Sequence, residues 1–348
     1  MTIPPGPHYG YGYGHPPPPP PKPGVIPLAP LGFGSILGGA FTTFGRYWKQ
    51  LIGVTAAVYG VALVFLGASM GIAYAAVGDL LPAVFDVPAG QEPRWDDARP
   101  LIVAFGCVWV AGLIATLCAG AVIAAACPAV VQEAVLGRPT SFGALWHRSW
   151  ARMPAVLGTV ILTSLPMLLM AAVFVTVFIA LLASLGGGPL TLVLTAFFGA
   201  AFAALLVAPL ALWLWVKFSL APAAAVMEGG GAIASMRRSS ALVRGSWWRS
   251  FGILLLVALG TLFVSWIIQQ MLSLVASAPL AAVDFSGDSP VTVVAAVAVV
   301  FAFLLVGQLV SQLVVSVFPP LVAALLYVDR RIRKENLAPD LARAAGLY

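Results

Sequence analysis

Charged residues are scarce in this sequence. They make up 9% of its 348 positions, whereas hydrophobic residues make up 61% and the mean hydropathy is +1.00. A soluble domain carries about 25% charged residues. A soluble globular fold is therefore excluded, and the composition is that of a protein embedded in lipid.

Cysteine and histidine are also rare. Cys107, Cys118 and Cys127 lie in or at the end of one apolar run, without a CxxC spacing or an even framework. This pattern predicts small buried residues in a transmembrane helix. Of the three histidines, two lie in the first 15 residues and the third is His147, so they predict no zinc or proton-relay cluster.

The sequence lacks the patterns typical of catalysis. It contains no GxSxG, HExxH or Walker A motif, and the long apolar runs hold no acid, nucleophile or metal ligand of the kind that intramembrane enzymes need. We therefore expect a protein that is not an enzyme and that has no cofactor and no metal site.

A secretory signal is missing from the first fifty residues, so we expect the N-terminus to stay in the cytoplasm. Residues 1–24 contain six consecutive prolines, from Pro16 to Pro21, among glycine and tyrosine. Such a tail cannot form a packed element and is expected to be disordered, with polyproline II character. It is either a plain spacer or a proline-rich ligand for a partner.

Six apolar runs follow, each long enough for the roughly 20 residues that cross a bilayer core. They predict an all-α polytopic membrane protein. The expected spans are residues 51–76, 101–126, 154–185, 190–216, 251–275 and 291–318. Pro319 and Pro320 should break the last helix, with a second short helix continuing to Tyr327.

The stretch AIASMRRSSALVRGSWWRSF, residues 232–251, precedes the fifth span and predicts one amphipathic interfacial helix. Arg238 and Arg249 should point away from its apolar face, which at 100° per residue is formed by Ile233, Met236, Ser240, Val243, Trp247 and Phe251. Long arginine stems can lie on apolar surface while their guanidinium groups reach phosphate or water, and tryptophan marks the headgroup level.

The same basic and aromatic pattern precedes the first span, in residues 33–50, and the third span, in residues 142–152. The chain therefore reads as three hairpin units, each preceded by an interfacial amphipathic helix. The residues expected to contact anionic lipid headgroups are Arg46, Lys49, Arg148, Arg152, Arg237, Arg238, Arg244, Arg249, Trp247 and Trp248.

Each hairpin also ends in a proline-led apolar stretch that carries an acid: CPAVVQEAVLGR from Cys127, APAAAVMEGGG from Ala221 and FPPLVAALLYVDRR from Phe318. The acids are Glu133, Glu228 and Asp329. An acid here can pair with an arginine of the next interfacial helix, for example Glu228 with Arg237 or Arg238. The alternative is a solvated charge at a helix end.

Four glutamines lie within the last two spans: Gln269, Gln270, Gln308 and Gln312. Gln308 and Gln312 share a helix face. Glutamines in spans either bond across the helix bundle or line a narrow polar path. Interhelical contact is the favoured interpretation, because no ionised residue accompanies them.

The net charge of +6 does not predict nucleic-acid binding, because no basic patch stands apart from the spans. The proposed cytoplasmic segments hold sixteen of the 18 lysines and arginines but five of the 12 acids. The positive-inside rule then places both termini in the cytoplasm and the protein in the cell membrane.

Three stretches carry a family resemblance: KPGVIPLAPLGFGSILGGAF from Lys22, AAAVMEGGGAIASMRRSSALVRGSWWRSFGILL from Ala223 and LLYVDRRIRKE from Leu325. Together they resemble the glycerophosphoryl diester phosphodiesterase membrane domain of actinobacterial multi-pass proteins. The resemblance implies a helical membrane domain of largely unknown role, sometimes fused to a catalytic barrel. Here the barrel is missing: the lone His147-Arg148 pair is followed by Ser149 rather than glycine, so phosphodiesterase activity is not implied.

These observations divide the chain into a cytoplasmic tail (1–24), a six-helix membrane domain (25–335) and a short cytoplasmic C-terminal tail (336–348). We expect a non-enzymatic membrane protein that scaffolds or regulates partners of unknown identity and contacts anionic lipid of the inner leaflet. The alternative is a small-molecule or lipid transporter. Against transport, the repeats are parallel rather than inverted, and the spans lack ionisable coupling residues.

The charge distribution generates a test of topology. A reporter that is active only outside the cell membrane should be active when fused after Gly90, Gly187 or Gly287, because the predicted outer loops carry only two lysines or arginines. Fusions after Gly24, Gly143, Gly230 and at the C-terminus should be silent. An active C-terminal fusion would contradict six spans.

Overall fold

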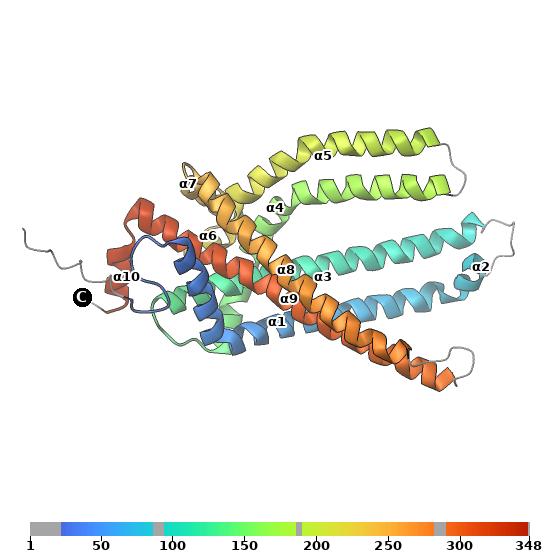
Figure 1. Ribbon diagram of the computed structural model, residues 1–348, viewed down its shortest axis with the longest axis horizontal. Coiled ribbons are helices and arrows are strands. Elements are labelled where there is room, and N and C mark those ends of the chain that lie inside the picture. The colour runs from blue at the N-terminus through green and yellow to red at the C-terminus, as the bar shows by residue number, and fades with distance from the viewer. Residues whose placement is uncertain (1–21, 86–93, 186–189, 282–289, 347–348) are drawn as a thin grey trace, which may run out of the picture.

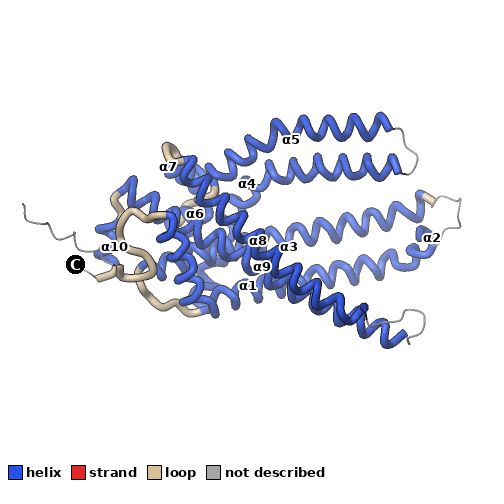
Figure 2. Tube along the Cα trace, viewed as in Figure 1, coloured by secondary structure: helices blue, strands red, loops and turns tan. Residues whose placement is uncertain are grey.

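The computed structural model describes residues 22–85, 94–185, 190–281 and 290–346. These residues form helices joined by short connections, and no strand occurs among them (Figure 2). Residues 86–93, 186–189 and 282–289 of the predicted outer loops, and residues 1–21 of the N-terminal tail, lie outside this description. The long helices are α1 (Phe33–Val77), α3 (Trp95–Val135), α4 (Phe142–Leu185), α5 (Leu190–Phe218), α8 (Trp247–Ala281) and α9 (Pro290–Glu335). The short ones are η1 (Gly78–Leu80), α2 (Leu81–Phe85), α6 (Ala221–Met227), α7 (Ala232–Val243) and α10 (Ala338–Ala344).

The long helices form three antiparallel hairpins, α1 with α3, α4 with α5, and α8 with α9. The hairpins meet at one end of the molecule, where α6, α7 and α10 also lie, and they diverge toward the other end (Figure 1). We call the shared end the charged end, because it holds the ion pairs described below. Membrane helices can diverge in this way because lipid covers apolar side chains as well as another helix does.

Five segments of the described chain are long and apolar enough to cross a membrane: Phe33–Leu80, Arg99–Val135, Leu205–Met227, Trp247–Ala278 and Val306–Glu335. Large apolar side chains along them are exposed, among them Val64, Phe105 and Leu205. The chain is therefore an all-α polytopic membrane protein. The remaining expected span, residues 154–185, lies on α4, where the side chains of residues 166–185 lie outside the description, so a sixth span stays a prediction.

The hydrophobic core lies at the charged end and is built from the three proline-led stretches. Most apolar residues of the end of α3, of α6 and of the end of α9 are buried there, including Val130, Ala225 and Leu325, each fully buried. The three stretches contact one another, and α1 packs across α3 and α9. The repeated sequence motif therefore forms the point at which the three units join.

Residues 25–31, which precede the first interfacial helix, are part of this core: Val25, Ile26 and Leu31 are buried. The Val25 amide donates to the Ala134 carbonyl at 3.1 Å. A Cβ atom at Gly24 would lie 2.0 Å from that same oxygen, so the close backbone approach requires glycine. The N-terminal segment is thus a packed element, although its short and irregular sequence gives no periodic signal.

The prediction of one helix over residues 232–251 is wrong in its length. Helix α7 ends at Val243, and Trp247 begins α8, because Gly245 adopts a left-handed φ of 80°. Glycine just after a helix is the usual stop signal. The face of α7 buried in the protein carries Ser235, Ser239 and Leu242, whereas Ile233 is exposed.

The other two interfacial segments continue into their spans, with a kink at Tyr47 in α1 and as part of α4 in the second unit. Helix α9 likewise continues through Pro319 and Pro320, which contradicts the expected break. Neighbouring helices bury Val317 and Leu321 on either side of the prolines and hold the helix together.

The expectation that all three cysteines are buried is wrong for Cys107. Among the cysteines, Cys127 is buried and Cys118 is partly buried, but Cys107 is exposed on α3. The C-terminal tail contains a helix, α10, whose Ala342 is buried and whose Ala344 carbonyl accepts a hydrogen bond from Arg138 at 2.9 Å. The segment after α9 therefore packs against the charged end.

Candidate functional site

The first acid–arginine pair joins unit one to unit two. Glu133 lies near the end of α3, and Arg148 lies in the first part of α4. Their Oε1 and Nη1 atoms are 3.0 Å apart, and Nη2 of Arg148 donates to Gln132 at 2.7 Å. The guanidinium group thus bridges two side chains of the preceding hairpin.

The second pair joins unit two to unit three. Nε of Arg238 on α7 donates to both carboxylate oxygens of Glu228, at 2.8 and 3.0 Å, and its Nη2 lies 2.5 Å from Glu335 on α9. The Tyr327 hydroxyl donates to Glu228, and Arg331 pairs with Glu335 at 2.9 Å. Of the two partners considered for Glu228, the structure selects Arg238.

The two carboxylates around Arg238 shift the pKa of its guanidinium group. Burial alone would lower the pKa of its guanidinium group, but the hydrogen bonds to Glu228 and Glu335 outweigh burial and raise the pKa above its ordinary value. Arg238 therefore stays cationic throughout the accessible pH range and is held by two carboxylates.

The third acid closes unit three onto the N-terminal segment. Asp329 is fully buried, and its Oδ1 accepts hydrogen bonds at 2.8 Å from the Leu31 amide and from Nε of Arg333. The Leu31 carbonyl accepts from Arg249 at 2.6 Å and from Arg333 at 2.8 Å. Both backbone polar groups of Leu31 are thus hydrogen-bonded to charged side chains of α8 and α9.

Other cations of the charged end bind backbone carbonyls. Arg152 donates to Gly229 at 3.0 Å, and Arg46 donates to Gly137 at 3.3 Å. Lys334 donates to the carbonyls of Ala241 and Arg244, at 2.9 and 2.7 Å, and so satisfies the end of α7. Five of the eight basic residues predicted to contact lipid therefore have protein partners: Arg46, Arg148, Arg152, Arg238 and Arg249.

The other three predicted basic residues, Lys49, Arg237 and Arg244, are exposed and form no side-chain hydrogen bond or ion pair with the described part of the chain. The Lys49 ammonium lies 5.7 Å from the ring centre of Trp48. Trp248 is 77% exposed, whereas Trp247 is partly buried and stacks on Phe251 with ring centres 5.1 Å apart. Exposed tryptophan beside exposed cations is the arrangement found at membrane interfaces.

Of the four glutamines in the last two spans, two contact another helix and two are exposed. Nε2 of Gln312 donates to the Tyr59 hydroxyl at 2.6 Å and so links α9 to α1. Gln269 lies against Gly307 of α9. Gln270 and Gln308 are exposed.

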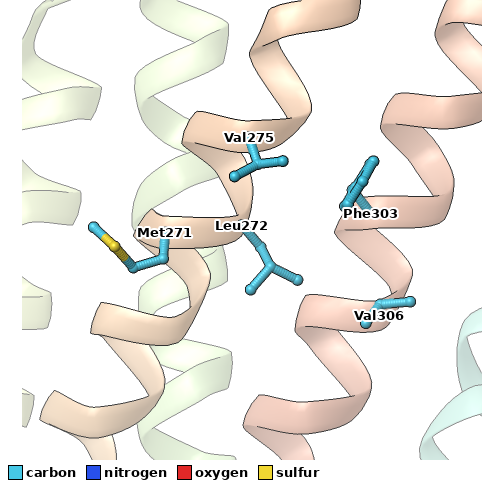
Figure 3. A pocket seen from close by; sticks show the side chains of 5 residues that line it. All are labelled: Met271, Leu272, Val275, Phe303 and Val306. Carbon is cyan, nitrogen blue, oxygen red and sulfur yellow. The ribbon is translucent and has the colours of Figure 1, made fainter.

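Two pockets near the spans are lined almost entirely by apolar side chains. One, of about 400 Å³, lies between α8 and α9 and is lined by Met271, Leu272, Val275, Phe303 and Val306 (Figure 3). The other, of about 490 Å³, lies where the interfacial part of α1 meets the α8–α9 hairpin and is lined mainly by leucine, valine and phenylalanine. These surfaces suit acyl chains, and no ionisable side chain lines either pocket.

Within the described ranges, no three histidine, cysteine or acidic side chains lie close enough together to hold a metal ion. The charged end also contains Lys217 and Tyr327, which are not among the site residues predicted from the sequence. The signal for Lys217 was its place beside Trp213 at the end of the fourth span, whereas nothing in the sequence marks the Tyr327 hydroxyl as a partner of Glu228.

These features define the chain as a polytopic helical membrane protein whose three hairpins are joined by ion pairs at one end. No family model matches the sequence, and no curated protein or solved structure matches it either. The resemblance to the glycerophosphoryl diester phosphodiesterase membrane domain therefore stays a prediction.

The contacts of Asp329 with Leu31, Arg249 and Arg333 predict a contribution to stability. Replacing Asp329 with asparagine leaves Arg249 and Arg333 without their buried counter-charge, which costs about 3 kcal/mol. We expect a clearly lower midpoint of thermal unfolding in detergent. The control is Asp340→Asn, which removes an exposed ion pair with Arg343 and should leave the midpoint almost unchanged. Equal effects of the two changes would contradict the role given to Asp329.

Proposed function

We propose that this chain is a non-enzymatic protein of the cell membrane that organises anionic lipid, and partners held at that lipid, on the cytoplasmic face. Its charged end would face the cytoplasm, in keeping with the positive-inside rule. The three hairpins would serve as the membrane anchor of this charged end.

The observation that carries the proposal is the division of the basic residues into two sets. One set is fixed in hydrogen bonds and ion pairs with other parts of the protein. The other set, with Lys49, Arg237 and Arg244, remains exposed; Lys49 lies beside Trp48, and Arg244 lines a pocket with Trp213 and Trp247. Each exposed cation near an anionic surface contributes about 1 kcal/mol at low salt.

The sequence resemblance points to the same class of protein, a helical membrane domain. Transport is the second candidate, and the apolar pocket of about 490 Å³ beside α1 favours a lipid as its substrate. The two functions differ in one observable: only a transporter moves a labelled lipid between the leaflets of a reconstituted vesicle.

The proposal predicts a preference for anionic lipid that depends on the exposed cations. In the variant with Lys49→Gln and Arg237→Gln, the amount of phosphatidylglycerol and cardiolipin that co-purifies in mild detergent should fall several-fold, because two favourable charges near the headgroups are lost. Lipid mass spectrometry of the purified protein measures the change.

A matched control removes the same charge from the other side of the membrane. Arg94 and Arg99 are exposed and lie in the predicted outer loop, so their replacement by glutamine should leave the lipid content unchanged. Equal lipid profiles in wild type and in the Lys49 and Arg237 variant, both correctly inserted, would contradict the proposed function.

A further inference from the structure

A pocket of about 440 Å³ lies at the charged end where α5, α7 and the start of α8 meet. It is lined by Trp213, Lys217, Ser240, Ala241, Val243, Arg244 and Trp247. The pocket thus combines two cations with two tryptophans, and none of its lining residues is acidic. Its volume lies in the range of pockets that hold small molecules.

The two cations of this pocket are not neutralised by the protein. Neither Lys217 nor Arg244 forms an ion pair with any carboxylate in the described residues, in contrast to Arg238, only six residues before Arg244. The Lys217 ammonium lies 4.3 Å from the ring centre of Trp213, which holds it at the pocket wall. The Lys334 ammonium donates to the Arg244 carbonyl at 2.7 Å, so a third positive charge lies next to the backbone of this pocket residue.

The backbone strengthens the positive field. Helix α8 begins at Trp247, which lines the pocket, and no acidic residue occurs in its first turn. The start of a helix presents unpaired amide groups and a partial positive charge, and both favour an anion. Charge, donors and cavity therefore point to the same kind of ligand, a phosphate group.

We infer that this pocket holds the phosphate group of an anionic phospholipid of the inner leaflet. The inference rests on the proposed contact between the charged end and anionic lipid. Helices α5 and α8 diverge away from the pocket (Figure 1), and both expose apolar side chains beyond it, including Leu210 and Leu256. A phospholipid whose phosphate group occupies the pocket can therefore lay its acyl chains along these two helices.

The inference is tested on the full-length protein in detergent, after extensive washing that removes loosely held lipid. Native mass spectrometry should find phosphatidylglycerol retained on the wild type. In the variant with Lys217→Gln and Arg244→Gln the retained fraction should fall at least tenfold. The variant with Arg94→Gln and Arg99→Gln, which loses the same charge outside the pocket, should retain it as the wild type does.

A second pair of variants keeps both cations in place. Ala241 is exposed and lines the pocket, so Ala241→Glu introduces a negative charge that should expel the lipid. Ala234 is exposed on the same helix but does not line the pocket, so Ala234→Glu should have no effect on retention. A pocket variant that retains phosphatidylglycerol as well as its control does would overturn the inference and leave the broader lipid preference standing. A wild type without any enrichment of anionic lipid, even before washing, would contradict the proposed function itself.

The same experiment separates a membrane lipid from a soluble source of phosphate. Inorganic phosphate or glycerol phosphate, added in excess, should fail to displace the retained lipid, because neither supplies acyl chains to α5 and α8. Displacement by either compound, or a fatty acid retained in place of a phospholipid, would overturn the assignment to a phospholipid.

Discussion

The buried carboxylate of Asp329 is the interaction on which the charged end depends. A carboxylate with no exposure to water is costly unless it is paired and hydrogen-bonded, and here the Leu31 amide and Arg333 donate to it. Because Leu31 precedes the first unit and Asp329 ends the third, this contact closes the chain of units. Glu133 and Glu228 make the two other connections, and the hairpins beyond them are free to diverge into lipid.

The division of the chain into spans could be predicted from the sequence because apolar runs of bilayer length are a strong signal. For the acids of the proline-led stretches the sequence left two interpretations open, and the structure shows an ion pair with the next interfacial segment for Glu133 and Glu228. Details that depend on tertiary packing could not be predicted. Pro319 and Pro320 remain inside α9 because the core holds the helix on both sides of them. Residues 25–31 are buried, although no periodic pattern marks them.

The sequence predicted basic residues at the membrane interface, but not which of them bind carboxylates and which stay exposed. Counting arginines could not separate Arg238, which two carboxylates hold, from Arg244, which lines a pocket without an acid. The difference follows from Gly245, whose left-handed backbone ends α7 and turns the chain into α8. A glycine after a basic helix is thus a stop signal, and here it lies between Arg244 and Trp247, which both line the pocket.

The acid–arginine pairs should couple neighbouring units energetically. A double-mutant cycle on Glu228 of unit two and Arg238 of unit three tests it most directly, with Glu228→Gln, Arg238→Gln and the double variant compared by denaturant unfolding in detergent. The account predicts a coupling free energy above about 0.5 kcal/mol, the lower end of the range for residues in contact. Additive effects of the two changes would contradict it and would reduce these pairs to surface charges that happen to lie close together.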